Sequence, residues 1–340
     1  MKSFFSTVLA VMFLTACASK KPQTTQEKPK SNGASRFDAE LTSYPYPFEV
    51  RYFPLKTQQQ ELKMAYMDIA AGKPTGKVIV LFHGKNFSGA YFESLILGLN
   101  QSGYRVIIPD QIGFGKSSKP AYYQYSFHTL AENTRLLLDS LGVNKFYLLG
   151  HSMGGMLATR FTLMFPEKVQ KLFLINPIGL EDWKTLISYR PVEENFKSEM
   201  AQTPESLKKY QLENYYDGRW KPEYDRWLEI PVGWLHSGDR ELIAWNSALT
   251  ADMIFTQPVY YEFKFLKTPT VLLIGDRDRT AIGKAWAAPN VKNQLGQYPK
   301  ISKDVSRMIP KSKLIFLKGK GHMPFIEDFE SFWRVFAREI

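Results

Sequence analysis

The chain of 340 residues has a single cysteine, so it cannot form an internal disulfide or a cysteine-based zinc site. It also lacks an internal repeat of the length found in solenoids and propellers. We find no metal-ligand cluster, and Gly113-Phe114-Gly115 is too short for a dinucleotide-binding fingerprint. We therefore expect the chemistry of this protein to need neither a metal nor another cofactor.

No apolar run is long enough to span a membrane. The run from Phe4 to Ala16 follows Lys2 and is shorter than the ~20 residues that a spanning helix needs. A short apolar run of this kind is typical of an export signal. It ends in Leu14-Thr15-Ala16-Cys17, which resembles the lipobox of bacterial lipoproteins, where the cysteine becomes the lipidated first residue. Ordinary cleavage after Ala18 is the alternative.

We therefore predict a signal peptide at residues 1–16 and a flexible tether at 17–44, anchored through a lipid on Cys17. Residues 18–43 of the tether have only Phe37 and Leu41 as large apolar residues, too few to offset the entropy of ordering it. The predicted protein is exported and membrane-anchored, facing the periplasm or the cell exterior.

Basic residues exceed acidic residues by 44 to 33, which gives a formal net charge of +11. Such an excess raises nucleic acid or an anionic membrane as possible partners. The basic residues are scattered, however, and no RNA- or DNA-binding motif accompanies them. A generally basic surface is the better interpretation, and we expect no nucleic-acid partner.

Short apolar runs alternate with helical patterns from residue 78 onward. The runs are Val78–Phe82, Val106–Ile108, Phe146–Leu149, Leu172–Ile175, Val271–Ile274 and Leu314–Leu317. Runs that are apolar on both faces are typical of parallel strands covered by helices on both sides. Two edge strands, Phe48–Pro54 and Leu62–Asp68, precede them. The sequence thus predicts an α/β fold, a mostly parallel doubly wound sheet of about eight strands.

The alternation stops at residues 180–265, where helical segments hold five of the seven tryptophans. An insertion here lies over the carboxyl ends of the strands, where ligands bind in open α/β sheets. We interpret it as a helical cap inserted after the sixth strand, between core segments 45–179 and 266–340. A small helical subdomain packed through its own aromatic residues is the alternative. The candidates for lining a substrate pocket are Trp183, Trp234, His236 and Trp245.

The segment Gly150-His151-Ser152-Met153-Gly154 matches G-x-S-x-G, between a predicted strand and a predicted helix. A serine nucleophile needs a general base, usually histidine. We favour His322 because it lies in a glycine-containing loop after the last strand, at the same sheet edge as Ser152. His151, within the elbow, is expected to point away from the site.

The third member of the site must be an acid at a neighbouring strand end. We take Asp278, which follows Val271–Ile274, and interpret Asp276 as a turn cap or an arginine partner. The resulting order of Ser152, Asp278 and His322 is the order expected of α/β-hydrolases.

From about residue 45 to 340 the chain resembles the α/β-hydrolase superfamily with a cap domain. His83-Gly84 resembles the HG turn of that family, and Gly321-His322 with Pro324 resembles its GHxP ending. The segment 109–117 resembles its PDxxGxGxS loop. The resemblance implies an oxyanion hole formed by the backbone N–H groups of Lys85 and Met153, with Asn86 as the alternative to Lys85.

Together these features predict a serine hydrolase that cleaves a small-molecule carboxylic ester with an apolar acyl or aryl group. A serine nucleophile disfavours haloalkane dehalogenases and epoxide hydrolases, which use an aspartate. The same triad also serves carbon–carbon bond hydrolases, aminopeptidases, haloperoxidase-like enzymes and acyltransferases. A lipid-anchored binding protein without turnover is the alternative from a different class.

Overall fold

The computed structural model describes Met1 and residues 36–340. Apart from Met1, the predicted signal peptide lies outside these residues, as do Cys17 and most of the predicted tether. Residues 36–340 belong to one compact unit. Among the described helices, none combines the length and the apolar character needed to cross a membrane.

The core of this unit is one sheet of eight strands in the order β1-β2-β4-β3-β5-β6-β7-β8. The strands are β1 (Val50–Thr57), β2 (Gln60–Ile69), β3 (Val78–Phe82), β4 (Arg105–Pro109), β5 (Phe146–His151), β6 (Val169–Ile175), β7 (Thr270–Gly275) and β8 (Ser312–Leu317). β2 pairs antiparallel with β1 and β4, and the remaining pairs are parallel. The predicted α/β fold with a mostly parallel sheet is therefore confirmed.

Helices cover both faces of the sheet because successive residues of each central strand point to opposite sides. In β3, Val80 and Phe82 belong to the same buried cluster as residues of α2 (Phe127–Ser140), α3 (Met153–Met164) and α9 (Tyr298–Met308). Ile79 and Leu81 of β3 belong to the cluster that includes α1 (Glu93–Gln101) and α11 (Phe329–Phe336). The continuous apolar runs in the sequence are thus required by burial on both faces.

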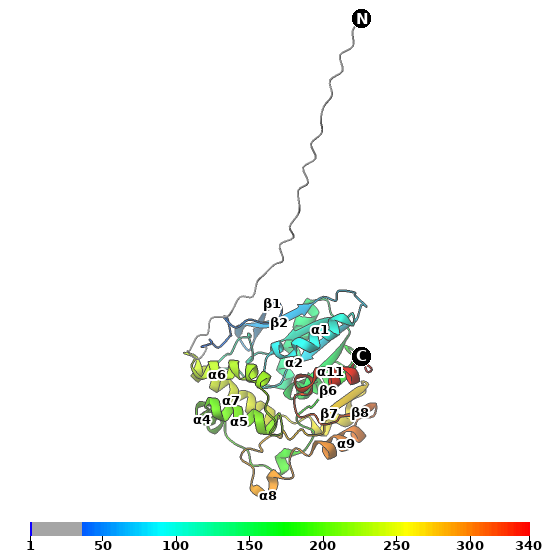
Figure 1. The fold of residues 1–340 in the computed structure, drawn as a ribbon. Helices are drawn as coiled ribbons and strands as arrows, with labels where there is room; N and C mark the ends of the chain where they lie inside the picture. Colours follow the sequence, from blue (N-terminus) through cyan, green and yellow to red (C-terminus); the bar gives the residue numbers. More distant parts are fainter. Residues whose placement is uncertain (2–35) are drawn as a thin grey trace. The chain divides into compact units, whose positions relative to one another are not determined.

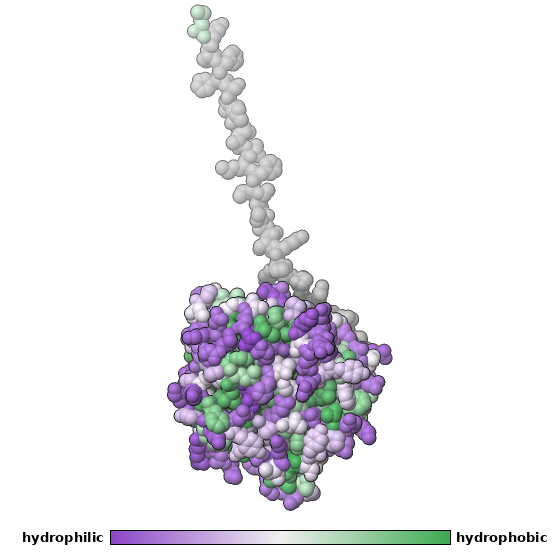
Figure 2. Space-filling model, turned by 180° about the vertical axis from the view of Figure 1, so that it is seen from behind, coloured by the Kyte–Doolittle hydropathy of each residue, from purple (hydrophilic) through white to green (hydrophobic). Residues whose placement is uncertain are grey.

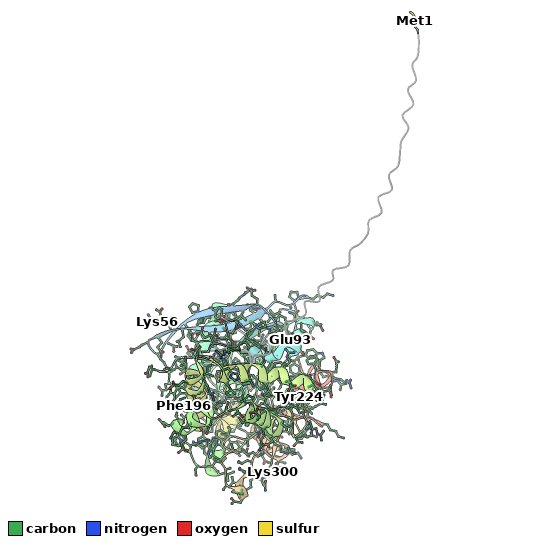
Figure 3. The ribbon with its side chains drawn as sticks, turned by 60° about the vertical axis from the view of Figure 1, so that its left-hand side comes forward. Met1, Lys56, Glu93, Phe196, Tyr224 and Lys300 are labelled. Atoms are coloured by element: carbon green, nitrogen blue, oxygen red, sulfur yellow. The ribbon has the colours of Figure 1, made fainter. Side chains whose placement is uncertain are left out.

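A helical segment joins β6 to β7, which places the insertion after the sixth strand, and we call it the cap. In Figure 1 its four α-helices gather on one side of the body, and Figure 3 labels Phe196 and Tyr224 within it. Its elements are η2 (Trp183–Thr185), α4 (Val192–Met200), α5 (Pro204–Asn214), η3 (Pro222–Leu228), α6 (Glu229–Leu235), α7 (Arg240–Thr256) and η4 (Tyr260–Phe265). The remaining short helices are η1 (Gly89–Phe92), α8 (Pro289–Lys292) and α10 (Pro324–Glu327).

The described end of the predicted tether packs against the body. Leu41 is fully buried, and its carbonyl accepts a hydrogen bond from the Lys116 ammonium. The Ala39 N–H donates to the Asp239 carboxylate at the start of α7, at 2.8 Å. The prediction of a flexible tether up to residue 44 is therefore wrong for residues 37–44. The segment has few apolar residues, but these contacts with the body stabilise it.

The face of the body that is seen in Figure 2 is mostly hydrophilic. In the face that Figure 2 shows, polar residues predominate and apolar residues form separate small patches. The large apolar side chains that are most exposed in the described body, such as Tyr122, Tyr189 and Phe265, come from different segments. Isolated exposed aromatic residues of this kind are ordinary on protein surfaces.

Candidate active site

Ser152 lies on the turn between β5 and α3, with a backbone φ of 57°. This left-handed conformation is strained for a residue with a Cβ, and it presents the hydroxyl at the apex of the turn. A Cβ at Gly150 would lie 2.2 Å from the Gly154 carbonyl oxygen, and one at Gly154 would lie 2.1 Å from the Phe82 carbonyl oxygen. The glycines of the motif are therefore required by the close approach of α3 to the sheet.

The structure brings Ser152, His322 and Asp278 together at the carboxyl ends of β5, β7 and β8. The Ser152 Oγ atom is 3.0 Å from His322 Nε2, and His322 Nδ1 is 2.7 Å from Asp278 Oδ2. The other Asp278 oxygen accepts the Thr280 N–H at 2.8 Å. Because Nδ1 faces a carboxylate, it carries the imidazole proton and leaves Nε2 free to accept the proton of Ser152.

Asp276 has a different environment from Asp278. Its Oδ1 atom accepts the Gly319 N–H at 2.8 Å and so ties the loop after β7 to the loop after β8. The neighbouring Arg277 donates to the Glu327 carboxylate at 2.6 Å. Of the two acids in this loop, Asp278 is the one that reaches the imidazole of His322.

His151 holds the backbone of His322 in place through a hydrogen bond. His151 Nε2 is 2.8 Å from the His322 carbonyl oxygen and donates to it. His151 Nδ1 accepts the Tyr91 hydroxyl proton at 2.8 Å, and the same hydroxyl oxygen accepts the Gly84 N–H at 3.0 Å. Burial, followed by the nearby His322, lowers the pKa of His151 well below its ordinary value, so this ring stays neutral. The expectation that His151 points away from the site overlooked this contact with the His322 carbonyl.

Asn176 is a second supporting residue that the sequence analysis did not single out. It follows β6, and its side-chain N–H₂ group donates to the carbonyls of Gly321 and His322 at 2.7 and 3.0 Å. Its Oδ1 atom accepts the Gly275 N–H at 2.7 Å. Its position directly after a central strand, at the edge that carries Ser152, was the available sequence signal.

The HG turn borders the nucleophile. A Cβ at Gly84 would lie 3.1 Å from the Ser152 Cβ atom. His83 is buried and holds the turn, since its Nδ1 donates to the Gly84 carbonyl at 2.9 Å and its Nε2 accepts the Gln111 N–H at 3.1 Å. Lys85, the residue after this turn, and Met153, the residue after Ser152, therefore belong to the two segments that border the nucleophile.

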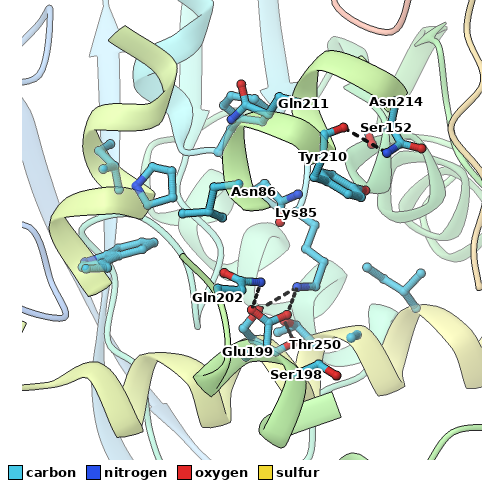
Figure 4. Close-up of a pocket in the computed structure, with 18 of the residues that line it drawn as sticks. Lys85, Asn86, Ser152, Ser198, Glu199, Gln202, Tyr210, Gln211, Asn214 and Thr250 are labelled. Atoms are coloured by element: carbon cyan, nitrogen blue, oxygen red, sulfur yellow. Dashed lines mark hydrogen bonds and ion pairs between the residues drawn. The ribbon is translucent and has the colours of Figure 1, made fainter. Parts of the chain in front are cut away.

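The side chains of Lys85 and Asn86 reach from this turn to the cap. Lys85 Nζ donates to Ser247 Oγ at 2.8 Å and lies 3.7 Å from a Glu199 carboxylate oxygen (Figure 4). Asn86 Nδ2 donates to the Tyr215 hydroxyl at 2.7 Å. The turn that borders the nucleophile is thus bonded to α4, α7 and the end of α5.

Ser152 opens into a cavity of about 890 Å³ between the core and the cap. Its apolar wall comes from both, and includes Phe87, Phe114, Ile178, Trp227, Trp234 and Ile254. The volume is within the range of sites for small organic ligands. In the described part of the chain, no group of three or more His, Cys, Asp or Glu side chains is placed to hold a metal ion.

Of the four predicted pocket residues, only Trp234 lines this cavity. Trp183 is fully buried in the core, and its indole N–H donates to the Phe255 carbonyl at 3.1 Å. The Trp245 indole N–H donates to the Ala121 carbonyl at 2.9 Å, and His236 is an exposed residue at the end of α6.

Residues 77–329 match the family described as alpha/beta hydrolase fold, and the chain belongs to that family. A solved structure of a probable hydrolytic enzyme from Pseudomonas aeruginosa PAO1 is similar, with a TM-score of 0.88 and 47% identity over 90% of this chain and 98% of that one. Lipase 1 of Psychrobacter immobilis is 27% identical over 275 residues, which are 78% of this chain and 76% of the lipase. A 2-hydroxy-6-oxononadienedioate/2-hydroxy-6-oxononatrienedioate hydrolase of Paraburkholderia phymatum is 39% identical over 118 residues, 34% of this chain and 40% of its own length.

Proposed function

We propose that the protein is a serine hydrolase that cleaves carboxylic esters with an apolar acyl or aryl group through an acyl-enzyme. The observation that carries the proposal is the hydrogen-bonded series of Ser152, His322 and Asp278 beside a large cavity whose lining is mostly apolar. The similarity to a lipase over three quarters of the chain supports the same substrate class.

In this mechanism Ser152 Oγ attacks the ester carbonyl carbon while His322 Nε2 takes the hydroxyl proton. The tetrahedral intermediate collapses, and the alcohol leaves with the proton from Nε2. Water then attacks the acyl-enzyme in the same way and releases the acid. Asp278 holds the Nδ1–H proton in place and stabilises the imidazolium cation that forms in each step.

The negative charge on the carbonyl oxygen needs donors that are already in position. We assign this role to the backbone N–H groups of Lys85 and Met153, which flank Ser152 from the HG turn and from α3. Losing one such donor typically costs ~10²–10³-fold in rate. Asn86 is bonded to the cap through its side chain, and its backbone N–H is the alternative donor on this side.

Carbon–carbon bond hydrolysis is the second candidate function, favoured by the local similarity to the hydrolase of Paraburkholderia phymatum. It would use the same nucleophile and base on a ketone carbonyl. An acyltransferase would depend on an added alcohol acceptor. A binding protein without turnover would leave a serine-directed probe unreacted.

The first experiment treats the protein with a fluorophosphonate probe and assays nitrophenyl esters of increasing acyl length. Wild type should label and hydrolyse these esters, whereas Ser152→Ala should not label and should lose on the order of 10⁴-fold or more in kcat. Ser140→Ala, which removes an exposed hydroxyl at the end of α2, away from the cavity, is the control and should keep both properties. Equal labelling of wild type and Ser152→Ala would refute the assignment. Labelling without turnover of any ester in the series would favour the carbon–carbon candidate.

We also propose that the chain is exported and anchored through a lipid on Cys17. The support is the sequence alone: a charged residue, a short apolar run and the only cysteine of the chain at the lipobox position.

A further inference from the structure

Tyr215, the residue directly after α5 in the cap, contacts both the base and the HG turn. Its ring stacks on the His322 imidazole, with centroids 5.0 Å apart and planes 22° from parallel. Its carbonyl oxygen accepts the His322 N–H at 2.9 Å. Its hydroxyl accepts the Asn86 side-chain N–H at 2.7 Å. One side chain of the cap thus joins the segment that carries the base to the segment that borders the nucleophile.

The surroundings of Tyr215 hold it in one position. It is buried, and the rings of Phe87 and Tyr210 pack against its ring at centroid distances of 5.8 and 5.4 Å. Burial raises the pKa of the Tyr215 phenol well above its ordinary value, so the hydroxyl stays neutral. A Cβ at Gly321 would lie 2.4 Å from the Tyr215 carbonyl oxygen, so the glycine before His322 is required for this approach.

The residues beside Tyr215 bind the loop that carries Asp278. The Asn214 carbonyl accepts the Thr280 hydroxyl proton at 3.2 Å, and the Thr280 N–H in turn donates to Asp278. The Tyr216 carbonyl accepts a hydrogen bond from Arg277 at 3.3 Å. The end of α5 is therefore bonded to three loops of the core, which carry the acid, the base and the HG turn.

We propose that Tyr215 is a positioning residue of the reaction, an inference that rests on the proposed function. Its ring fixes the plane of the His322 imidazole, so that Nε2 faces Ser152, and it offers a π-face to the imidazolium cation formed in the transition state. Its hydroxyl holds Asn86, and through it the turn whose backbone donates to the oxyanion. The cap thus aligns the base with the oxyanion hole and does more than enclose the substrate.

Two substitutions separate these contributions. Tyr215→Phe keeps the ring and the backbone contact but removes the bond to Asn86, so kcat for a short nitrophenyl ester should fall about 5–10-fold, the worth of one hydrogen bond. Tyr215→Leu also removes the stacked ring, and its kcat should fall on the order of 10²-fold. The KM for the short ester should stay within about threefold, because positioning acts on the chemical step.

A double-mutant cycle tests whether Tyr215 acts through Asn86. If the bond between the two side chains is the cause, Tyr215→Phe with Asn86→Ala should be no slower than the slower single variant. Multiplied effects of the two substitutions would overturn this part of the proposal.

Tyr224→Phe is the matched control, since Tyr224 (labelled in Figure 3) is another buried tyrosine of the cap. Its ring stacks on that of Tyr216, with the ring centroids 3.9 Å apart. This control should keep wild-type kcat, and the Tyr215 variants should share its melting temperature within a few degrees. Wild-type kcat in both Tyr215 variants would overturn the proposal. So would variants in which the KM rises or the melting temperature falls while kcat does not change. If Tyr215→Leu does not fold, the kcat of Tyr215→Phe and the double-mutant cycle with Asn86→Ala still test the proposal. An inactive wild type would instead refute the proposed hydrolysis itself, which separates the two failures.

Discussion

At the scale of single residues, three histidines share one hydrogen-bonded region and differ in what surrounds them. His322 faces a carboxylate and a hydroxyl, the combination that suits a general base. His83 and His151 are bonded to backbone carbonyls, and burial lowers the pKa of both. These two uncharged rings stabilise the backbone around the site. The surroundings of each histidine, and not the residue type, therefore decide whether it acts as a base or as a structural residue.

The buried His151 makes stability depend on pH. Its folded-state pKa lies below the ordinary 6.5, so on acidification the unfolded chain takes up a proton before the folded chain does. The stability that the neutral ring contributes is present above pH 6.5 and decreases below it, by up to ~1.4 kcal/mol per pH unit. When the pH falls from about 7.5 to 5.5, we therefore expect the free energy of unfolding to decrease in both proteins. The decrease in His151→Gln should be about 1 kcal/mol smaller than that in wild type.

Urea denaturation at the two pH values measures this difference. His236→Gln, at an exposed position, is the control and should follow wild type. Identical pH dependence in His151→Gln and wild type would show that the buried ring is not responsible.

At the scale of elements, the segment 37–44 connects the cap to the core. Leu41 has a backbone φ of 54° and is nevertheless fully buried at the cavity wall. The Trp234 indole N–H donates to the Asp38 carbonyl at 3.0 Å, and the Lys63 ammonium pairs with Glu40 at 2.6 Å. A left-handed backbone at a residue with a Cβ is strained, and the surrounding contacts have to compensate for it.

We expect Leu41→Ala to reduce the free energy of unfolding by ~2–5 kcal/mol, because it removes a fully buried side chain and leaves a space at the junction of cap and core. Leu97→Ala is the matched control, since that side chain is 47% exposed, and it should cost much less. Chemical denaturation of the three proteins gives the values. Equal stability of the two variants would mean that residues 37–44 do not pack firmly on the body.

At the scale of the whole molecule, the proposed lipid anchor decides where the hydrolase acts. Cells fed an alkynyl fatty acid should label the wild-type chain and should not label Cys17→Ser, while Ser19→Ala should label normally. Wild type should also sediment with membranes. An unlabelled wild-type chain that stays in the soluble fraction would contradict the anchor.

Much of the fold could be predicted because its signals are local. Strands such as β3 and β7 are buried on both faces, and this burial requires an unbroken apolar run. Ser152, Asp278 and His322 were found together because each follows a strand, and the carboxyl ends of parallel strands meet at one edge.

The sequence by itself therefore determined the sheet, the cap's place in the chain and the three residues that meet at the sheet edge. Only the tertiary structure decided that Tyr215 stacks on His322, that Trp234 and not Trp183 faces the cavity, and that residues 37–44 pack on the body. These features depend on contacts between segments far apart in the chain and on how short cap helices are rotated. Neither the long-range contacts nor the helix rotations leave a periodic pattern in the local sequence, because the partner that stabilises each side chain comes from elsewhere in the fold.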